Sequence, residues 1–354
     1  MDNQTLKTKI EQGLNELELK RKMFRASMFG TVKLIFILDI LLVILLIVFA
    51  QSIGDMIFGV VEEGYENNNA VVGYVLASFL FFAALAGSFF TILRTTRSYN
   101  NFAKTKFVTP LMRNIFPELD YFPNNYVSEN LFLNSELYTS YNHYGGDDYF
   151  KGTLNGKYVE FSELVVSRRS NNNSDNSRSS STTIFGGLFL CVKLNNSVSS
   201  RIVIENGELN TKVNEALEKV PAFLKNFINK FIPDYGPVVE TGDFEFDKLF
   251  KVYCANSEEL SKVITPAVRA ELIKIYNDVL KYVNVGNNRP LDLKEINSAS
   301  ALFKLSIKND SLYFAVPNIR LFDIPFNRNV IENQETLVTS LTSIKMLTDL
   351  AKVI

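Results

Sequence analysis

The sequence predicts a two-helix transmembrane hairpin followed by a cytoplasmic α+β domain with a largely antiparallel sheet. Two long apolar stretches, residues 34–50 and 71–93, lie near the N-terminus. Beyond residue 95, short runs of alternating apolar residues are separated by turn residues and by segments with helical periodicity. We therefore expect an amphipathic helix over residues 1–30, the hairpin over 31–94 with spans at about 32–51 and 71–93, and the α+β domain over 95–354.

Both apolar stretches are long enough to cross a bilayer. Residues 71–93 carry no charge and would form a helix about 34 Å long, against a hydrocarbon core of about 30 Å. The first stretch contains one carboxylate, Asp39, among Leu, Ile, Val and Phe. Each of these apolar residues favours insertion by about 0.3 to 0.6 kcal/mol, and an Asp opposes it by about 3 kcal/mol. The apolar majority outweighs Asp39, so the first span is expected to insert.

A cleaved signal peptide is the competing interpretation of the first stretch. The sequence "FAQSIGDM" that follows it lacks a small-residue cleavage pattern, and a long charged segment precedes it. These two features favour a retained membrane anchor.

The charges that flank the spans predict their orientation. Lys and Arg residues precede the first span and follow the second, whereas the loop over residues 51–70 contains four acidic residues and no basic one. Because basic flanks stay in the cytoplasm, both termini are expected there, with the chain in the inner membrane as a multi-pass protein. The basic residues expected to attract anionic lipid headgroups are Lys20, Arg21, Lys22, Arg25, Arg94 and Arg97.

The two spans are expected to touch through small and polar residues. Asp39 and Ser88 lie at similar depth, and "AALAGS" offers the pairs Ala83–Gly87 and Ala84–Ser88 at the small-x-x-x-small spacing. We expect Asp39, Ser88 and Gly87 to form an intramembrane helix contact, with a hydrogen bond from Ser88 or Thr91 to Asp39. Proton or ion handling by Asp39 is the less favoured alternative.

The segment over residues 3–28 has apolar residues at helical spacing. It is expected to pack on the cytoplasmic domain or on a neighbouring subunit, and a helix lying on the lipid surface is the alternative.

Turn and cap residues place the elements of the C-terminal domain. Asn155-Gly156 predicts a type I′ hairpin turn within residues 148–166, and residues 167–183 are expected to form a mobile polar loop. Two strands follow, "TIFGGLFLCVKLN" and "SRIVIENG", and then a helix over residues 213–231. A second hairpin is expected around "KNDS", and a last helix carries Leu337 to Ala351.

Two helix starts are marked by capping patterns. Asn256 followed by Glu259 predicts a capping box, and Thr265-Pro266 predicts an N-cap and first helical residue for a helix to about Val283. Cys191 and Cys254 lie in strand-like runs and are expected to be buried free thiols, with a disulfide as the alternative.

The residues suggest no enzyme active site. No phosphate-binding loop, dinucleotide fingerprint, nucleophile elbow or H-E-x-x-H pattern occurs, and two Cys with one His cannot complete a structural zinc site. His143, near Asp147 and Asp148, is expected in an exposed turn rather than in a catalytic pair. We predict no catalytic residue, cofactor or metal. A net charge of −1 without a basic stripe argues against nucleic-acid binding.

Short motifs resemble a bacterial membrane-protein family catalogued as domain of unknown function 3137. They are Asp148, Phe150 and Gly152; Phe185, Gly187 and Phe189; and Ile264, Thr265 and Pro266. The resemblance implies two N-terminal spans, a cytoplasmic domain and a possible LemA-type membrane partner, and it supplies no catalytic residues. Physically, the Phe residues are expected in the core and the Gly residues at close approaches between strands.

These inferences favour a non-catalytic membrane scaffold or adaptor, binding lipid and associating with itself or with another membrane protein. A membrane-tethered enzyme acting on a lipid or cytoplasmic substrate is the alternative, and an accessory subunit of a transport system is another. A deep pocket lined by His143, Asp147 and Asp148 would favour the enzyme.

Overall fold

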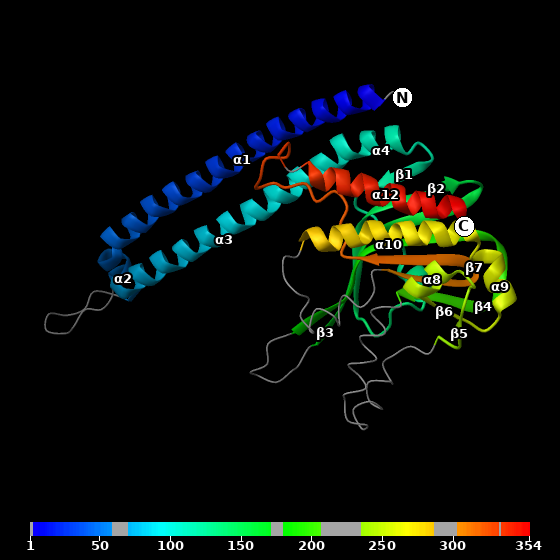
Figure 1. Cartoon of the computed structure of the whole chain (residues 1–354). Coiled ribbons are helices and arrows are strands. Elements are labelled where there is room, and N and C mark those ends of the chain that lie inside the picture. Colours follow the sequence, from blue (N-terminus) through cyan, green and yellow to red (C-terminus); the bar gives the residue numbers. More distant parts are fainter. Residues whose placement is uncertain (1–2, 59–69, 171–179, 207–234, 287–302, 333) are drawn as a thin grey trace. The chain divides into compact units, whose positions relative to one another are not determined.

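The computed structural model describes residues 3–58, 70–170, 180–206, 235–286, 303–332 and 334–354 (Figure 1). The chain forms two compact units. The helical unit comprises Met1–Val108 and Ile324–Gln334, and the sheet unit comprises Thr109–Asp323 and Glu335–Ile354. The helix predicted over residues 213–231 lies outside the described residues.

The helical unit is built on two long antiparallel helices. They are α1 (Asn3–Val48) and α3 (Ala70–Ala103), with the shorter α2 (Ala50–Phe58) between them and a π-helical turn, η1 (Lys104–Val108), after α3. The sequence predicted a separate N-terminal helix over residues 1–30. Helix α1 instead continues past residue 30 without a break. Both helices pass the length and composition test for a membrane span, over Ile10–Val48 and Ala70–Ile115.

Small residues let α1 and α3 approach closely. The buried positions in the apolar part of α3 are Gly73, Ala77, Ala84 and Ser88. A Cβ atom placed on Gly73 would lie 3.2 Å from the Leu46 carbonyl oxygen of α1 and 2.5 Å from the Cα atom of Ala50, the first residue of α2, so a larger residue there would push the helices apart. Beyond the apolar part, the Phe24 ring packs edge-on against the Tyr99 ring at 5.9 Å between centroids.

A segment distant in sequence also belongs to the helical unit. Residues 324–334, here called the return segment, leave the sheet unit after Asp323 and re-enter it at Glu335. The Glu18 carboxylate accepts a hydrogen bond from the Val330 backbone N–H at 3.0 Å, and Arg21 donates to the Phe326 carbonyl at 3.2 Å. Side chains of α1 thus hold the return segment by hydrogen bonds to its backbone groups.

The sheet unit is an α+β domain, as predicted, and every strand pair in it is antiparallel. The strands are β1 (Leu119–Phe122), β2 (His143–Leu154), β3 (Lys157–Ser170), β4 (Ser180–Asn206), β5 (Val238–Val239), β6 (Phe250–Cys254) and β7 (Lys304–Pro317). The helices are α4 (Thr109–Ile115), α5 (Glu129–Asn134), α8 (Phe244–Leu249), α9 (Ser257–Val263), α10 (Pro266–Gly286) and α12 (Glu335–Val353). The strand order is β1-β2-β3-β4-β6-β5, and β7 pairs with β4.

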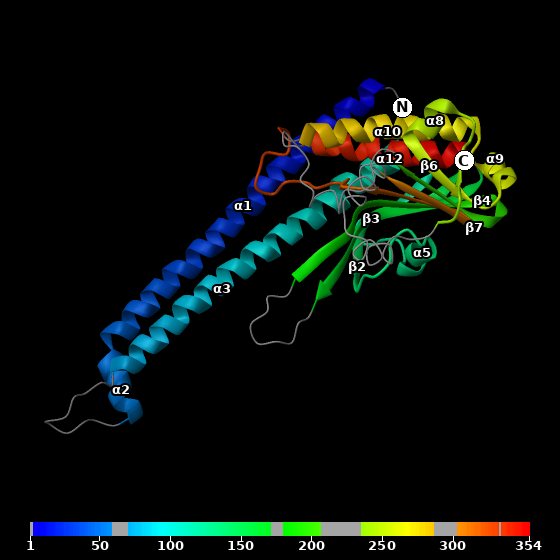
Figure 2. The same cartoon turned by 60° about the horizontal axis from the view of Figure 1, so that its bottom comes forward.

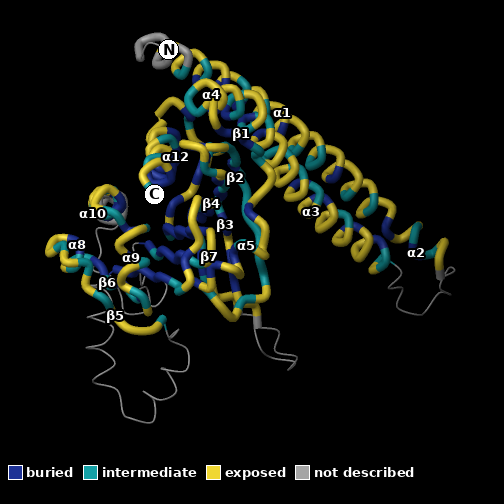
Figure 3. The backbone as a smooth tube through the Cα atoms, turned by 90° about the vertical axis from the view of Figure 1, so that its right-hand side faces the viewer, coloured by how far each residue is buried: buried dark blue, intermediate teal, exposed yellow. Residues whose placement is uncertain are grey.

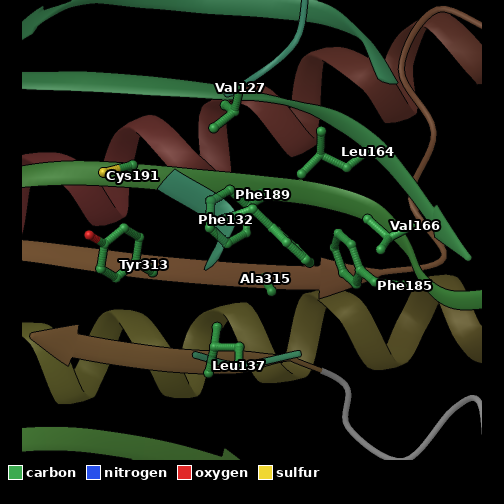
Figure 4. Close-up of a cluster of buried hydrophobic side chains, with 10 residues drawn as sticks. All are labelled: Val127, Phe132, Leu137, Leu164, Val166, Phe185, Phe189, Cys191, Tyr313 and Ala315. Atoms are coloured by element: carbon green, nitrogen blue, oxygen red, sulfur yellow. The ribbon is translucent and has the colours of Figure 1, made fainter. Parts of the chain in front are cut away.

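Helices cover both faces of this sheet. Figure 2 shows α10 and α12 on one face and α5 on the other. Figure 3 shows buried backbone concentrated in the strands, whereas much of α1 and α3 is exposed. On the α5 face, Phe132 packs among Phe185, Phe189 and Leu164 (Figure 4). The predicted core positions Phe150, Phe185 and Phe189 are all buried.

The predicted turn and caps are confirmed. Asn155 and Gly156 have φ values of 49° and 77°, the two positive angles that a type I′ turn requires. The Asn256 side chain accepts hydrogen bonds from the Glu258 and Glu259 backbone N–H groups, and α10 begins at Pro266 after Thr265. The capping box is incomplete, however, because the Glu259 carboxylate accepts hydrogen bonds from Ser199 and Ser200 instead.

Three predictions about strands were wrong. Residues 167–170 and 180–183 continue β3 and β4 in paired register, where a polar loop was expected; residues 171–179 lie outside the described residues. The two strands expected in 184–206 form the single strand β4, and the expected "KNDS" hairpin is the single strand β7. The irregular register between β4 and β7 falls between Lys193 and Ile202 of β4, so β4 carries the extra residues. Strand β7 continues through Asn309, whose positive φ of 54° marks a local irregularity.

Two smaller expectations concerned Cys and His residues. Cys191 and Cys254 are buried free thiols, as predicted, and burial raises the pKa of Cys191 to about 12. His143 was expected in a turn, but it begins β2 and pairs with Ser167 across the ladder.

Candidate functional site

A cavity of about 610 Å³ opens on the sheet unit. It lies where β3, β4, the loop after β7 and the first turns of α12 meet. Its lining residues are Glu163, Val165, Thr183, Gly186, Gly187, Asn318, Arg320, Asp323, Glu335, Thr336 and Thr339. We call it the polar pocket because eight of these eleven residues have hydroxyl, amide or charged side chains, although apolar atoms contribute most of its accessible surface.

Close packing behind the pocket explains the glycine in the F-x-G-x-F motif. A Cβ atom on Gly187 would lie 2.2 Å from the Val316 carbonyl oxygen, and Gly187 has a φ of 156°. Phe185 and Phe189 on either side are buried in the core. The Asn318 N–H donates to the Gly186 carbonyl at 2.8 Å and fixes the loop that follows β7. The motif thus shapes one wall of the pocket without supplying reactive groups.

The charges of the pocket are mostly acidic. Glu163, Asp323 and Glu335 contribute carboxylates, against the single guanidinium of Arg320. Glu163 is held by a hydrogen bond of 2.8 Å from the Leu321 backbone N–H to its Oε2 atom. Carboxylates and threonine hydroxyls together accept and donate hydrogen bonds, so the pocket suits a polar ligand or a peptide segment with several donor groups.

Glu163 also belongs to an acidic cluster with Asp147 and Asp148. One ligand atom from each lies within 4.8 Å of the others. Asp148 is buried at an irregularity in β2 and accepts a hydrogen bond from the Tyr121 hydroxyl. Burial, reinforced by the Asp148 carboxylate, raises the pKa of Tyr121 far above its usual value and keeps it a donor. Three carboxylate groups at this spacing could hold a hard divalent cation.

Of the three residues predicted to form the intramembrane helix contact, Asp39 and Ser88 are buried and Gly87 has open space beside it. Asp39 and Ser88 are 9% and 5% exposed. Because the helices are antiparallel and Ala50 lies against Gly73 while Phe24 lies against Tyr99, Asp39 falls near the level of Ala84. The expected hydrogen bond is not formed among the described residues: the Ser88 hydroxyl has no partner, and Thr91 donates to the Gly87 carbonyl. A Cβ atom on Gly87 would meet no atom within 4 Å among the described residues, so the expected contact of Gly87 with the first helix is not formed there.

One of the residues predicted to bind lipid headgroups, Arg21, is buried in the structure. Arg21 is 6% exposed and forms an ion pair of 2.6 Å with Glu18, so its guanidinium is not available to headgroups. Arg25 is partly engaged, since it donates to the Asn327 carbonyl. Lys22, Arg94 and Arg97 are exposed, and Lys20 is half-buried. Their contact with lipid stays a prediction.

Sequence reasoning missed both the polar pocket and the return segment. Asp147 and Asp148 were considered only as partners of His143, and Glu163 was not singled out. The cluster depends on the register that places Asp147 opposite Glu163 across β2 and β3. Counting back from the Asn155-Gly156 turn would have placed Asp148 opposite Glu163, because the register shift between Asp147 and Phe150 has no local signal. Nothing local pointed to residues 318–339.

The fold and the site define a chain with two candidate membrane helices and an antiparallel α+β unit that carries an open polar pocket. Residues 183–286 match the model of the family described as "Protein of unknown function (DUF3137)", which confirms the resemblance found in the sequence. No curated protein matches the chain.

One solved structure is similar, the crystal structure of the mycobacterial trehalose monomycolate transport factor A, TtfA. The match has 11% sequence identity and a TM-score of 0.24, and it covers 67% of this chain and 88% of that chain. A TM-score this low does not establish a shared fold.

Proposed function

We propose that this chain is an integral membrane adaptor. In this proposal α1 and α3 cross the inner membrane, both termini lie in the cytoplasm, and the sheet unit presents the polar pocket to a partner protein. The chain performs no catalysis in this role. Self-association or a second membrane protein, for which a LemA-type protein is one candidate, would supply the partner.

The apolar surface of the two long helices carries this proposal. Within the most apolar stretch of each candidate span, 6% of the residues in α1 and 17% in α3 are buried. The large apolar residues of α1 and α3 that are at least 40% exposed include Leu34, Leu38, Leu41, Ile44, Leu45, Val75, Phe79, Phe82, Phe89 and Phe90. A water-soluble monomer rarely exposes a continuous apolar surface of this size, whereas a bilayer solvates it.

The polar pocket supports the adaptor part of the proposal. Among the residues that the structure describes, its lining includes none of His143, Asp147 and Asp148, the residues that would have favoured an enzyme. Hydroxyl, amide and carboxylate groups around an open cavity are suited to recognising hydrogen-bond donors on a partner.

The test is affinity purification from detergent-solubilised membranes, using the full chain with a tag behind Ile354. Thr339 lines the pocket, so Thr339→Trp fills it, whereas Thr342→Trp places the same side chain on an exposed position one turn along α12. The adaptor predicts a membrane protein that co-purifies with the wild type and with Thr342→Trp and is depleted with Thr339→Trp. Equal recovery with both variants, or no co-purifying membrane protein, contradicts the proposal.

The acidic cluster favours a second candidate, a membrane-tethered enzyme that depends on a divalent cation. Under this alternative, Mg²⁺ or Ca²⁺ raises the unfolding temperature of the full chain in detergent, and Asp147→Asn abolishes the rise. Asp120→Asn, at an exposed position on β1, is the control. An unchanged unfolding temperature in the wild type removes this candidate.

A further inference from the structure

The return segment turns closest to the predicted span at Asn327 and Arg328. Its contacts on α1 step along the helix: Val330 contacts Glu18, Phe326 contacts Arg21, and Asn327 contacts Arg25. Of these three residues of α1, Arg25 lies nearest to the first predicted span. The segment therefore runs along α1 towards the predicted span, turns near Asn327 and Arg328, and runs back. Figure 1 shows this segment alongside α1 and α3.

The depth of this turn corresponds to the headgroup layer. Arg25 precedes the predicted start of the first span by a distance of about 10 Å along the helix. The polar layer on each side of the hydrocarbon core is about 5 to 7 Å thick, and a long arginine side chain can extend across the remainder. On α3, Tyr99 packs against Phe24, so Arg97 lies close to the level of Arg25.

The turn exposes a cationic side chain, which anionic lipid headgroups attract. Arg328 is exposed, and it makes no ion pair among the residues that the structure describes. Ile331 is 38% exposed on the same segment, which adds an apolar side chain beside the charge. Arg94 and Arg97 on α3 are exposed as well, and Lys22 on α1 is exposed beside Glu18, so cations from three parts of the helical unit flank the predicted spans.

We propose that the return segment is a lipid-binding element, in which Arg328 binds the phosphate of anionic phospholipid headgroups at the cytoplasmic surface. This inference rests on the proposed membrane insertion of the hairpin. The segment is continuous at both ends with the sheet unit, so headgroup binding there tethers the sheet unit to the bilayer at a point more than two hundred residues beyond the second span in the sequence. The motifs and flanks of the sequence gave no indication of it.

The experiment measures how close residue 331 lies to headgroups. Ile331→Cys in the full chain is labelled with an environment-sensitive fluorophore; the native Cys191 and Cys254 are buried and are not expected to react in the folded protein. The protein is reconstituted in nanodiscs of phosphatidylcholine, or of equal parts phosphatidylcholine and phosphatidylglycerol, each with a trace of headgroup-spin-labelled lipid. The proposal predicts stronger quenching with phosphatidylglycerol, lost in Arg328→Gln and retained in Arg328→Lys.

Two controls separate the possible failures. Arg113→Gln removes an exposed cation from α4 and should leave the quenching unchanged. A fluorophore on Ile37→Cys, in the apolar part of α1, reports whether the hairpin is inserted, through quenching by acyl-chain-labelled lipid. If residue 37 is quenched and residue 331 shows no dependence on phosphatidylglycerol or on Arg328, this inference alone is overturned. If residue 37 is not quenched, the proposed membrane insertion and this inference both fail.

Discussion

The Glu18 carboxylate accepts a hydrogen bond from the backbone N–H of Val330, a residue 312 positions later in the chain. The same carboxylate pairs with Arg21 at 2.6 Å, and Arg21 in turn donates to the Phe326 carbonyl. Both charged side chains are largely buried. One ion pair on α1 therefore holds both limbs of the return segment, which belongs to the same compact unit as α1.

Removing the Glu18 carboxylate should release the return segment. Glu18→Ala leaves Arg21 as an unpaired buried charge and Val330 N–H without its acceptor, which costs on the order of 3 kcal/mol. Hydrogen exchange of the full chain in detergent should show faster exchange across residues 324–332 by at least roughly tenfold. Glu16→Ala, at an exposed position on the same helix, is the control. Unchanged protection in Glu18→Ala would show that other contacts hold the segment.

The two glycines of α3 offer a matched test of helix packing. Gly73→Ala brings a Cβ atom to 2.5 Å from Ala50, whereas Gly87→Ala meets nothing within 4 Å. Overpacking of this kind costs about 1 to 3 kcal/mol, so Gly73→Ala should lower the unfolding temperature of the full chain in detergent. Gly87→Ala should leave it unchanged. If Gly87→Ala instead alters the oligomeric state, Gly87 contacts a second chain.

The ionised Glu259 carboxylate makes the stability of the sheet unit depend on pH. The Ser199 hydroxyl, followed by the backbone N–H groups of Ser200 and Ser199, lowers the pKa of Glu259 to about 2. In the unfolded chain the pKa of a Glu is about 4.3, so its stabilising contribution is complete above that pH. The contribution is lost as the pH falls through about 2.

Urea unfolding of wild type and Glu259→Gln over this range measures the effect. The difference in midpoint should be greatest above the unfolded pKa and should shrink towards zero at the acid end. Glu258→Gln, on the same turn of α9, is the control. A difference that does not vary with pH would mean that the charge of Glu259 contributes nothing.

The hydrogen bond between Tyr121 and Asp148 should be important for stability. Tyr121→Phe keeps the ring but removes the donor to a fully buried carboxylate, at a cost of about 1 to 3 kcal/mol. Urea unfolding of the full chain measures this loss. Tyr126→Phe, whose side chain is 42% exposed, should fall close to the wild type. Equal stability of all three proteins contradicts a structural role for this bond.

Features set by neighbouring residues could be predicted from the sequence. The Asn155-Gly156 turn, the Asn256 cap and the start of α10 depend on side chains within a few positions, and all three were found. The continuous strand β7 was missed because "KNDS" has turn composition, and Asn309 does have a positive φ of 54°. The residues on both sides of it pair with the same strand, β4, which no local pattern indicates. The return segment depends on Glu18, far away in the chain, and no local pattern could reveal it.

If α1 and α3 cross the bilayer, they retain the whole chain in the membrane. Extraction of isolated membranes with alkaline carbonate, followed by centrifugation and detection of a tag behind Ile354, distinguishes an inserted chain from a peripheral one. The full-length chain should remain in the membrane pellet. Recovery of the intact chain in the supernatant would show that the two helices do not span the bilayer.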